Sequence, residues 1–143
     1  MGLSKQLAKI KLLVSDFDGV MTDGFVYVDQ NGKETVRCSR KDGLGIELLK
    51  KHGIMVGVLS KEKNPVVAAR CRKLRIPYWQ NLKGGSLKLG VLRKVMKAKR
   101  LVPGAVAYIG DDLNDLAVLR YVGLAIAVHD AHPAVKQVAD YVT

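Results

Sequence analysis

The chain has 143 residues, of which 48% are hydrophobic, and its formal net charge is +11. A chain of this length can bury one hydrophobic core, so we expect a single domain over residues 1–143. The sequence contains no run of roughly 20 apolar residues and no signal-peptide pattern, which predicts a soluble, cytoplasmic protein without a membrane partner.

The positive charge is concentrated between residues 61 and 100, where lysine and arginine far outnumber acids. Such a field attracts anions. This stretch has one aromatic pair, Tyr78-Trp79, and no recognisable nucleic-acid module, so we expect no nucleic-acid partner; a basic nucleic-acid-binding module is the alternative. Most of these charges are expected to lie on the solvated faces of two helices.

An apolar run over 10–14 predicts the first buried strand, and Asp16-Phe17-Asp18-Gly19 follows it. In an extended chain, side chains two residues apart point the same way, so Asp16 and Asp18 can converge on one metal ion or phosphate. Open α/β sheets place their chemistry where strands end. A simple turn that closes the strand is the alternative for this segment.

A β-hairpin is predicted next, because two short β-prone segments flank Asp29-Gln30-Asn31-Gly32. Asn-Gly is the strongest short-range hairpin signal, so we expect a flap over about 25–38, beside the Asp16 loop.

Helices and strands alternate in the rest of the chain, as apolar periodicity and helix-start signals indicate. The expected helices cover about 42–52, 65–74, 113–120 and 133–138, and a further helix follows Gly84-Gly85-Ser86 and runs to about Lys99. The expected strands cover about 54–59, 77–79, 105–109, 124–128 and 141–142. This order predicts a Rossmann-like, three-layer α/β domain with a mostly parallel sheet covered on both faces.

A second acidic cluster, Gly110-Asp111-Asp112-Leu113-Asn114-Asp115, follows the predicted strand at 105–109. Five aspartates gathered at one place would repel one another unless a cation lay among them, and ligands that are all oxygen favour Mg²⁺. The alternative for Asp111 and Asp112 is a helix N-cap followed by an acidic first turn.

The ends of three predicted strands meet along one edge of such a sheet, which places Asp16, Ser60 and Asp111 together. Lys88 could reach this edge from the start of a helix, and the backbone amides near Gly19 are further donors, so the set can bind a phosphate. Taken separately, Ser60 could be a helix cap and Lys88 a surface lysine.

These segments together resemble the four motifs of the haloacid dehalogenase superfamily phosphatases, and the resemblance covers nearly the whole chain. With no inserted cap domain, with Thr22-Asp23-Gly24 and with the flap, the chain is similar to the small capless branch. The motif residues are Asp16, Asp18, Gly19, Val20, Thr22, Asp23, Gly24, Ser60, Lys88, Gly110, Asp111, Asp112, Asn114 and Asp115.

The resemblance implies a role for each of these aspartates. Asp16 would attack phosphorus and form an aspartyl-phosphate, while Asp18 protonates the leaving alcohol and then activates water. Asp16, the Asp18 backbone carbonyl and Asp111 would hold Mg²⁺, and Lys88 would offset phosphoryl charge. The acids that would orient Lys88 and metal-bound water are Asp112 and Asp115, with Asp112 as the alternative direct ligand.

The resemblance also implies the substrate class, a phosphorylated sugar acid. The residues expected to bind substrate or phosphate are Gly19, Ser60, Lys61, Glu62, Lys73 and Asn114. Glu62 and Lys73 resemble residues of the phosphatases that act on nine-carbon keto sugar acid 9-phosphates of the sialic acid type, which we therefore expect as substrates. The alternatives are 3-deoxy-D-manno-octulosonate 8-phosphate, or a non-catalytic regulatory domain of the kind associated with acylneuraminate cytidylyltransferases.

Two departures from the family pattern qualify the expected site. The segment before Lys88 is longer than usual, so Lys83 is the alternative motif lysine. The sequence also ends without the glycine-rich, arginine-containing tail with which family members close a neighbour's site. The resemblance implies a homotetramer in which a neighbouring subunit serves as the cap, and we expect the site of this chain to be exposed.

Overall fold

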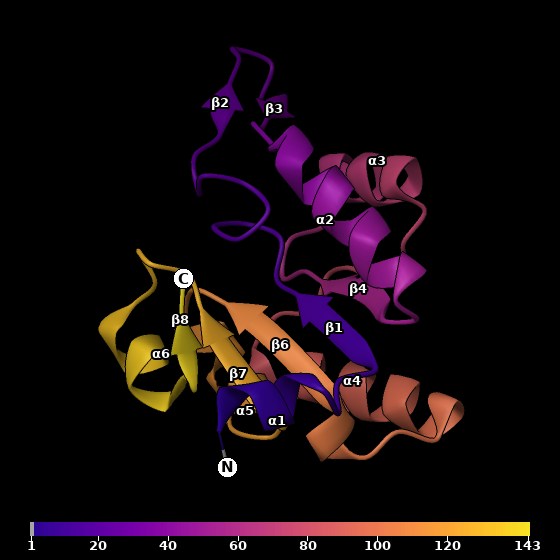
Figure 1. Ribbon diagram of the computed structural model, residues 1–143. Coiled ribbons are helices and arrows are strands. Elements are labelled where there is room, and N and C mark those ends of the chain that lie inside the picture. The colour runs from indigo at the N-terminus through magenta and orange to yellow at the C-terminus, as the bar shows by residue number, and fades with distance from the viewer. Residues whose placement is uncertain (1) are drawn as a thin grey trace.

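A six-stranded sheet forms the centre of the protein, shown as a computed structural model in Figure 1, and the structure describes residues 2–143. The strand order is β5-β4-β1-β6-β7-β8, and every neighbouring pair is parallel. The strands are β1 (Leu12–Ser15), β4 (Met55–Leu59), β5 (Tyr78–Trp79), β6 (Val106–Gly110), β7 (Leu124–Ala127) and β8 (Tyr141–Val142). The predicted α/β fold class is confirmed.

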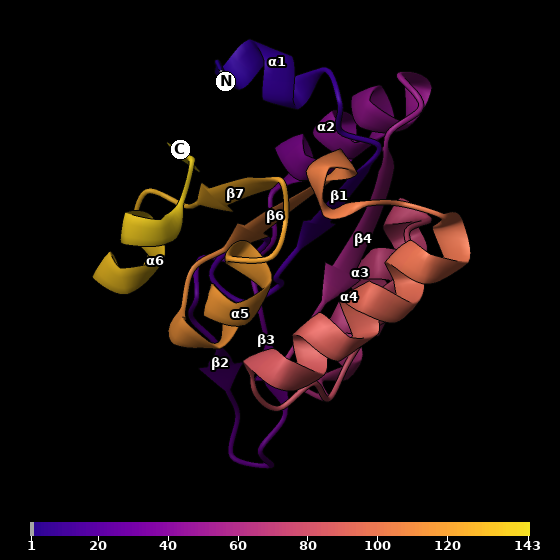
Figure 2. The same cartoon turned by 90° about the horizontal axis from the view of Figure 1, so that it is seen from below.

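Helices cover both faces of this sheet. One face packs against α4 (Gly85–Lys99), α5 (Leu116–Leu119) and α6 (Pro133–Val138), and the other against α2 (Arg40–Lys51) and α3 (Pro65–Leu74). Figure 2 shows α4 and α5 on the near side and α2 on the far side. Leu59 belongs to the core under α4 and Val58 to the core under α2 and α3, because successive strand residues point to opposite faces.

The strand order reverses beside β1. From β1 the chain builds the sheet outward through β4 and β5, then returns through α4 to place β6 on the other side of β1. In open α/β sheets, ligands bind at the carboxyl ends of the strands that border such a reversal. Here those strands are β1 and β6, which end at Ser15 and Gly110.

Two helix starts determine which side chains reach this edge. Asn64 caps α3, since its Oδ1 accepts a hydrogen bond from the Val66 amide at 3.0 Å, and Pro65 occupies the first helical position. α4 begins at Gly85, and Lys88 in its first turn is fully buried. α3 starts where the sequence predicts it, whereas α4 starts two residues earlier than predicted, within the Gly84-Gly85-Ser86 segment.

The flap consists of β2 (Tyr27–Val28) and β3 (Glu34–Thr35), which pair antiparallel. Its strands are shorter than predicted, and their side chains are exposed. Asp29 Oδ1 closes the turn by accepting two backbone hydrogen bonds. In Figure 1 the flap projects away from the sheet on the side where β1 ends.

Three local features differ from the sequence prediction. The helix expected over 113–120 is a 3-10 turn, η2 (Leu113–Asp115), followed by α5, because Asp112 and Asp115 form a capping box that tightens the first turn. The helix α1 (Leu3–Leu7) and the turn η1 (Pro103–Ala105) were not predicted; α1 has five residues and buries none of them. No helix within residues 2–143 is long and apolar enough to cross a membrane.

Candidate active site

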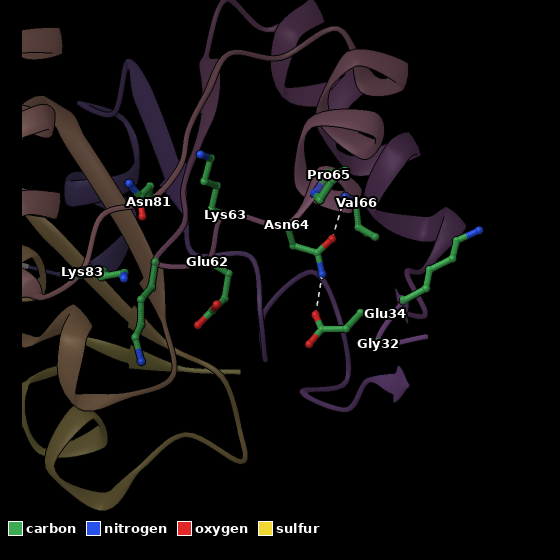
Figure 3. Close-up of a pocket in the computed structure, with 11 residues that line it drawn as sticks. Gly32, Glu34, Glu62, Lys63, Asn64, Pro65, Val66, Asn81 and Lys83 are labelled. Carbon is green, nitrogen blue, oxygen red and sulfur yellow. Dashed lines mark hydrogen bonds between the residues drawn. The ribbon is translucent and has the colours of Figure 1, made fainter. Parts of the chain in front are cut away.

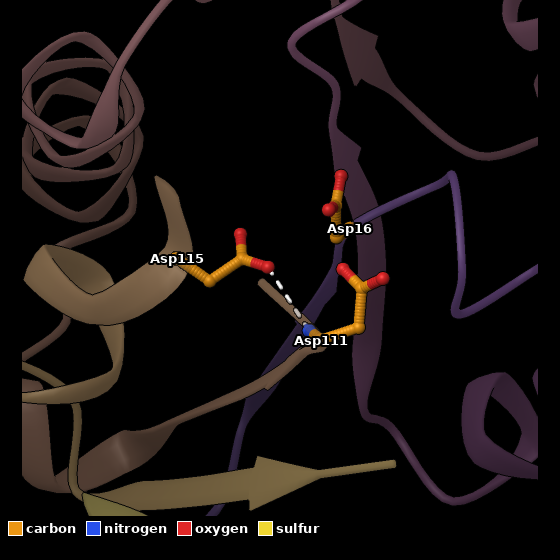
Figure 4. Close-up of side chains that lie close together, drawn as sticks. All are labelled: Asp16, Asp111 and Asp115. Carbon is orange, nitrogen blue, oxygen red and sulfur yellow. Dashed lines mark hydrogen bonds between the residues drawn. The ribbon is translucent and has the colours of Figure 1, made fainter. Parts of the chain in front are cut away.

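The ends of β1 and β6 bring two aspartates together. Ser15, the last residue of β1, pairs with Ile109 on β6, so Asp16 and Asp111 follow at the same edge of the sheet. Figure 4 shows their carboxylates side by side, with Asp115 facing them from η2. One oxygen from each of the three carboxylates lies within 4.8 Å of the others. These are three of the five aspartates that the two acidic segments were expected to gather; the side chains of Asp18 and Asp112 are not part of this group.

Lys88 joins two of these carboxylates from the opposite side. Its Nζ lies 3.0 Å from Asp16 Oδ1 and 2.8 Å from Asp115 Oδ1, and the Lys88 and Asp115 side chains are fully buried. Asp16 is 5% exposed. Because ion pairs screened from water are strong only when their geometry is well satisfied, this arrangement fixes the ammonium beside Asp16.

Asp115 is held by four donors. Its Oδ1 accepts hydrogen bonds from Lys88 and from the Tyr108 hydroxyl at 2.6 Å. Its Oδ2 accepts from the backbone amides of Asp111 at 3.0 Å and Asp112 at 3.3 Å. Both oxygens are therefore occupied, and Asp115 positions Lys88 and the turn after β6.

The cluster combines three acids, Asp16, Asp111 and Asp115, with the ammonium of Lys88. This imbalance of charge shifts the pKa values of the cluster. Burial raises the pKa of Asp16 well above its ordinary value and the charge of Asp115 adds to the rise, while Lys88 opposes it. Burial alone would lower the pKa of Lys88, but the charges of Asp16 and Asp115 outweigh it and raise the pKa. Lys88 is therefore a stable ammonium.

Asp111 is the carboxylate best suited to share a metal ion with Asp16. Burial and the charge of Asp115 raise the pKa of Asp111 to about 6. A Cβ on Gly19, which has φ +81°, would overlap Asp111 Oδ2, so only glycine lets this loop approach the carboxylate. The excess of negative charge and the all-oxygen donor set fit Mg²⁺. The bound ion would offset the negative charge of the carboxylates.

Ser60 extends the site at the end of β4. Its hydroxyl oxygen is buried and has no hydrogen-bond partner within residues 2–143. A buried hydroxyl without a partner is uncommon, because its desolvation is uncompensated. This oxygen is therefore available to an anion at the sheet edge, which favours the predicted phosphate role over a helix cap.

A pocket of about 400 Å³ opens at this edge. Strand ends, the β4–α3 loop and the flap all contribute to it. Its lining residues are Asp16, Asp18, Gly19, Gly24, Val26, Glu34, Lys61, Glu62, Asn64, Asp111, Asp112 and Asn114. The structure thus places Lys61, Glu62 and Asn114 in the same pocket as Asp16.

Lys73 does not lie at the site, and its predicted placement there is wrong. It occupies the last turn of α3 and is exposed, nine residues after the Asn64 cap that lines the pocket. At 1.5 Å per residue, that distance along the helix is roughly 13 Å. The alternative motif lysine, Lys83, is exposed, whereas Lys88 is the buried lysine that contacts Asp16.

Three residues near the site were not identified as functional from the sequence. Tyr108 is a buried tyrosine within an apolar strand. Because a buried tyrosine hydroxyl needs a hydrogen-bond partner, its position in the sequence could have indicated a polar neighbour. Glu34 and Asn64 line the pocket from segments predicted only as a flap strand and a helix start. Their proximity depends on how the flap folds back, which local patterns do not encode.

Comparison with known proteins identifies the family. The sequence model of the haloacid dehalogenase-like hydrolases matches residues 59–143. The chain is 40% identical over 134 residues to 3-deoxy-D-manno-octulosonate 8-phosphate phosphatase of Escherichia coli K12. The matched segment covers 94% of this chain and 70% of that protein. The enzyme of the same name from Yersinia pestis is 37% identical over 139 residues, covering 97% and 73%.

Solved structures agree with the sequence comparison. A HAD superfamily hydrolase from Legionella pneumophila superposes with a TM-score of 0.94 at 37% identity, covering 99% of this chain and 76% of that one. The Moraxella catarrhalis 3-deoxy-D-manno-octulosonate 8-phosphate phosphatase, solved with magnesium, phosphate and KDO, gives 0.90 at 32% identity, covering 99% and 82%. The chain therefore belongs to the haloacid dehalogenase family of hydrolases and is a phosphatase.

Proposed function

We propose that the chain hydrolyses the phosphate ester of an eight-carbon keto sugar acid of the 3-deoxy-D-manno-octulosonate 8-phosphate class. The Lys88 ammonium 3.0 Å from Asp16 Oδ1 carries the phosphoryl-transfer part of this proposal. The substrate class is supported by the names of the relatives and by the KDO bound in the Moraxella catarrhalis structure.

Asp16 is the proposed nucleophile. Its Oδ1 accepts a hydrogen bond from the Phe17 amide at 2.7 Å and pairs with Lys88, which leaves Oδ2 to attack phosphorus. The new bond joins Oδ2 to phosphorus, and the bond between phosphorus and the ester oxygen breaks. Lys88 offsets the negative charge that spreads over the phosphoryl oxygens.

Asp18 is the proposed general acid and base. It gives its proton to the departing alkoxide, then removes a proton from the water that hydrolyses the aspartyl-phosphate and frees Asp16. Burial raises the pKa of Asp18, and the nearby charges of Glu62 and Glu34 raise it further. A raised pKa favours the protonated form that the first step needs.

Asp16, the backbone carbonyl of Asp18 and Asp111 are the proposed ligands of Mg²⁺. When bound, the ion neutralises phosphoryl charge and orients the ester for attack. Asp115 is a poorer ligand because both of its oxygens already accept hydrogen bonds. Asp112 is exposed and caps η2, so it is proposed to hold the turn that carries Asp111.

The remaining pocket residues are proposed to bind the phosphate and the sugar acid. Gly19, which lines the pocket, and the unpaired Ser60 hydroxyl are proposed to bind the phosphate, and Lys61, Glu62 and Asn114 of the pocket lining the rest of the substrate. We also propose that a neighbouring subunit of a tetramer caps this open site. The flap supports this, since Phe25 is 75% and Tyr27 70% exposed, and such surfaces mark interfaces.

A nine-carbon keto sugar acid 9-phosphate is the second candidate substrate, and Glu62 in the pocket is the observation that favours it. Phosphate release from both sugar acid phosphates, by wild type and Glu62→Arg, tests the choice. We expect wild type to prefer the eight-carbon ester. A preference for the nine-carbon ester that Glu62→Arg reverses would favour the second candidate, and a chain that releases phosphate from neither would support a regulatory role.

A further inference from the structure

Asn64 connects three segments around the pocket. Its side-chain Oδ1 caps α3, and its Nδ2 donates a hydrogen bond to Glu34 Oε2 on the flap at 2.7 Å. Its backbone carbonyl accepts a hydrogen bond of 2.7 Å from the side chain of Gln80, which follows β5. Asn64 is thus held through its side-chain Oδ1 and through its backbone carbonyl, while its Nδ2 points at the flap.

This contact ties the β2–β3 end of the flap to the body of the protein. The other side-chain bonds from the flap to neighbouring segments described within residues 2–143 lie at the base of the flap, where Asp23 accepts hydrogen bonds from the Phe25 amide and from Arg37. The strands β2 and β3 are exposed. Figure 3 shows the Asn64 amide between the two segments, with one dashed line to Val66 and one to Glu34.

The same contact lies on the border of two adjoining pockets. The pocket at Asp16 shares Glu34, Lys61, Glu62 and Asn64 with an adjoining pocket of about 670 Å³. The adjoining pocket lies between the flap turn and the β4–α3 loop, and its lining carries lysines as well as acids. A molecule with its phosphate at Asp16 would therefore extend along Glu34 and Glu62.

We propose that Asn64 is a positioning residue that latches the flap through Glu34 and so forms the wall of the site that receives the sugar part of the substrate. The proposal deepens the proposed function and rests on it. Carboxylates of Glu34 and Glu62 accept hydrogen bonds from hydroxyl groups, and the lysines of the wall attract a carboxylate. A polyhydroxy acid matches this combination, whereas a plain aryl phosphate has no group for it.

Asn64→Asp tests the latch without removing the helix cap. Aspartate caps helices as well as asparagine does, but in place of the Nδ2 donor it presents a second carboxylate to Glu34. We expect the KM for 3-deoxy-D-manno-octulosonate 8-phosphate to rise by about tenfold, with a smaller rise for an aryl phosphate, since a hydrogen bond to a charged group is lost. Asn31→Asp, which adds the same charge at the flap turn, is the matched control.

Adding Glu34→Gln to Asn64→Asp restores a hydrogen bond between positions 34 and 64, with the donor and the acceptor exchanged. In this double variant the new amide on the flap donates to the new carboxylate at the helix cap, so the second substitution should cancel the effect of the first. We expect the KM for the sugar acid ester to be higher in Asn64→Asp than in wild type. In the double variant, the KM should stay within about twofold of that of Glu34→Gln alone. A purely structural role of Asn64 would show no such dependence on the flap residue.

Hydrogen exchange of the flap amides gives a readout that does not depend on substrate. Exchange at 25–36 should be faster in Asn64→Asp than in wild type and should return to the wild-type rate in the double variant. Equal exchange in wild type and Asn64→Asp would overturn the latch. Faster exchange with an unchanged KM would overturn its role in the substrate wall, and wild type without phosphatase activity would instead overturn the proposed function.

Discussion

The inner and outer halves of the site are built differently. Around Asp16 and Lys88, charged groups are buried and occupied by several partners each, so their positions are fixed before any ligand arrives. Glu34 and Glu62, by contrast, are exposed, and the Glu34 carboxylate is held by a hydrogen bond from Asn64. Electrostatic stabilisation is strongest where water is excluded, so the inner half suits the chemistry and the outer half suits the choice of substrate.

Lys88→Met should give the largest effect, because it removes the one internal cation from the inner half. We expect phosphatase activity to fall by about 10³-fold or more, as for loss of a group that stabilises transition-state charge. The free energy of unfolding should fall by about 3–5 kcal/mol, since two buried carboxylates lose their partner. Steady-state kinetics and urea unfolding measure the two effects.

Lys94→Met is the matched control for Lys88→Met, since it makes the same change at an exposed position of α4. It should alter the free energy of unfolding by less than about 0.5 kcal/mol and leave the rate at the wild-type value. A comparable loss in both variants would mean that the two lysines do not differ in role.

The pH dependence of Mg²⁺ binding tests the inner half of the site separately from the outer half, because the proposed metal ligands belong to the inner half. Asp111, with a pKa of about 6, keeps its proton below that pH when no metal is bound, and Mg²⁺ must displace it. The Mg²⁺ concentration for half-maximal activity should therefore rise by about tenfold between pH 7 and pH 5. A constant Mg²⁺ requirement over this range would exclude Asp111 as a ligand.

Tyr108→Phe should have a smaller effect, because it removes one of four donors to Asp115. We expect a loss of about 1.5 kcal/mol in the free energy of unfolding and a fall in rate of less than about tenfold. Thermal unfolding and kinetics of the same preparation measure both. A loss as large as that of Lys88→Met would show that the hydroxyl, not the lysine, dominates the network.

The sequence predicted the inner half better than the outer half. Asp16 and Asp111 follow apolar strands, and a parallel sheet leaves little freedom in where strand ends lie, so their meeting could be foreseen. Lys73 was assigned to the site through the family resemblance alone, and it lies in the last turn of α3, away from the Asn64 cap that lines the pocket. The contact between Glu34 and Asn64 spans 30 residues and depends on the angle of the flap, which no local pattern encodes.

The central claim is that Asp16 is the nucleophile of a magnesium-dependent phosphatase, and phosphate release from an aryl phosphate tests it most directly. Wild type should release phosphate with Mg²⁺ and lose this activity with a chelator. Asp16→Asn, which keeps the size of the side chain but not the carboxylate, should release at least about 10³-fold less. Equal release by Asp16→Asn and wild type would contradict the account.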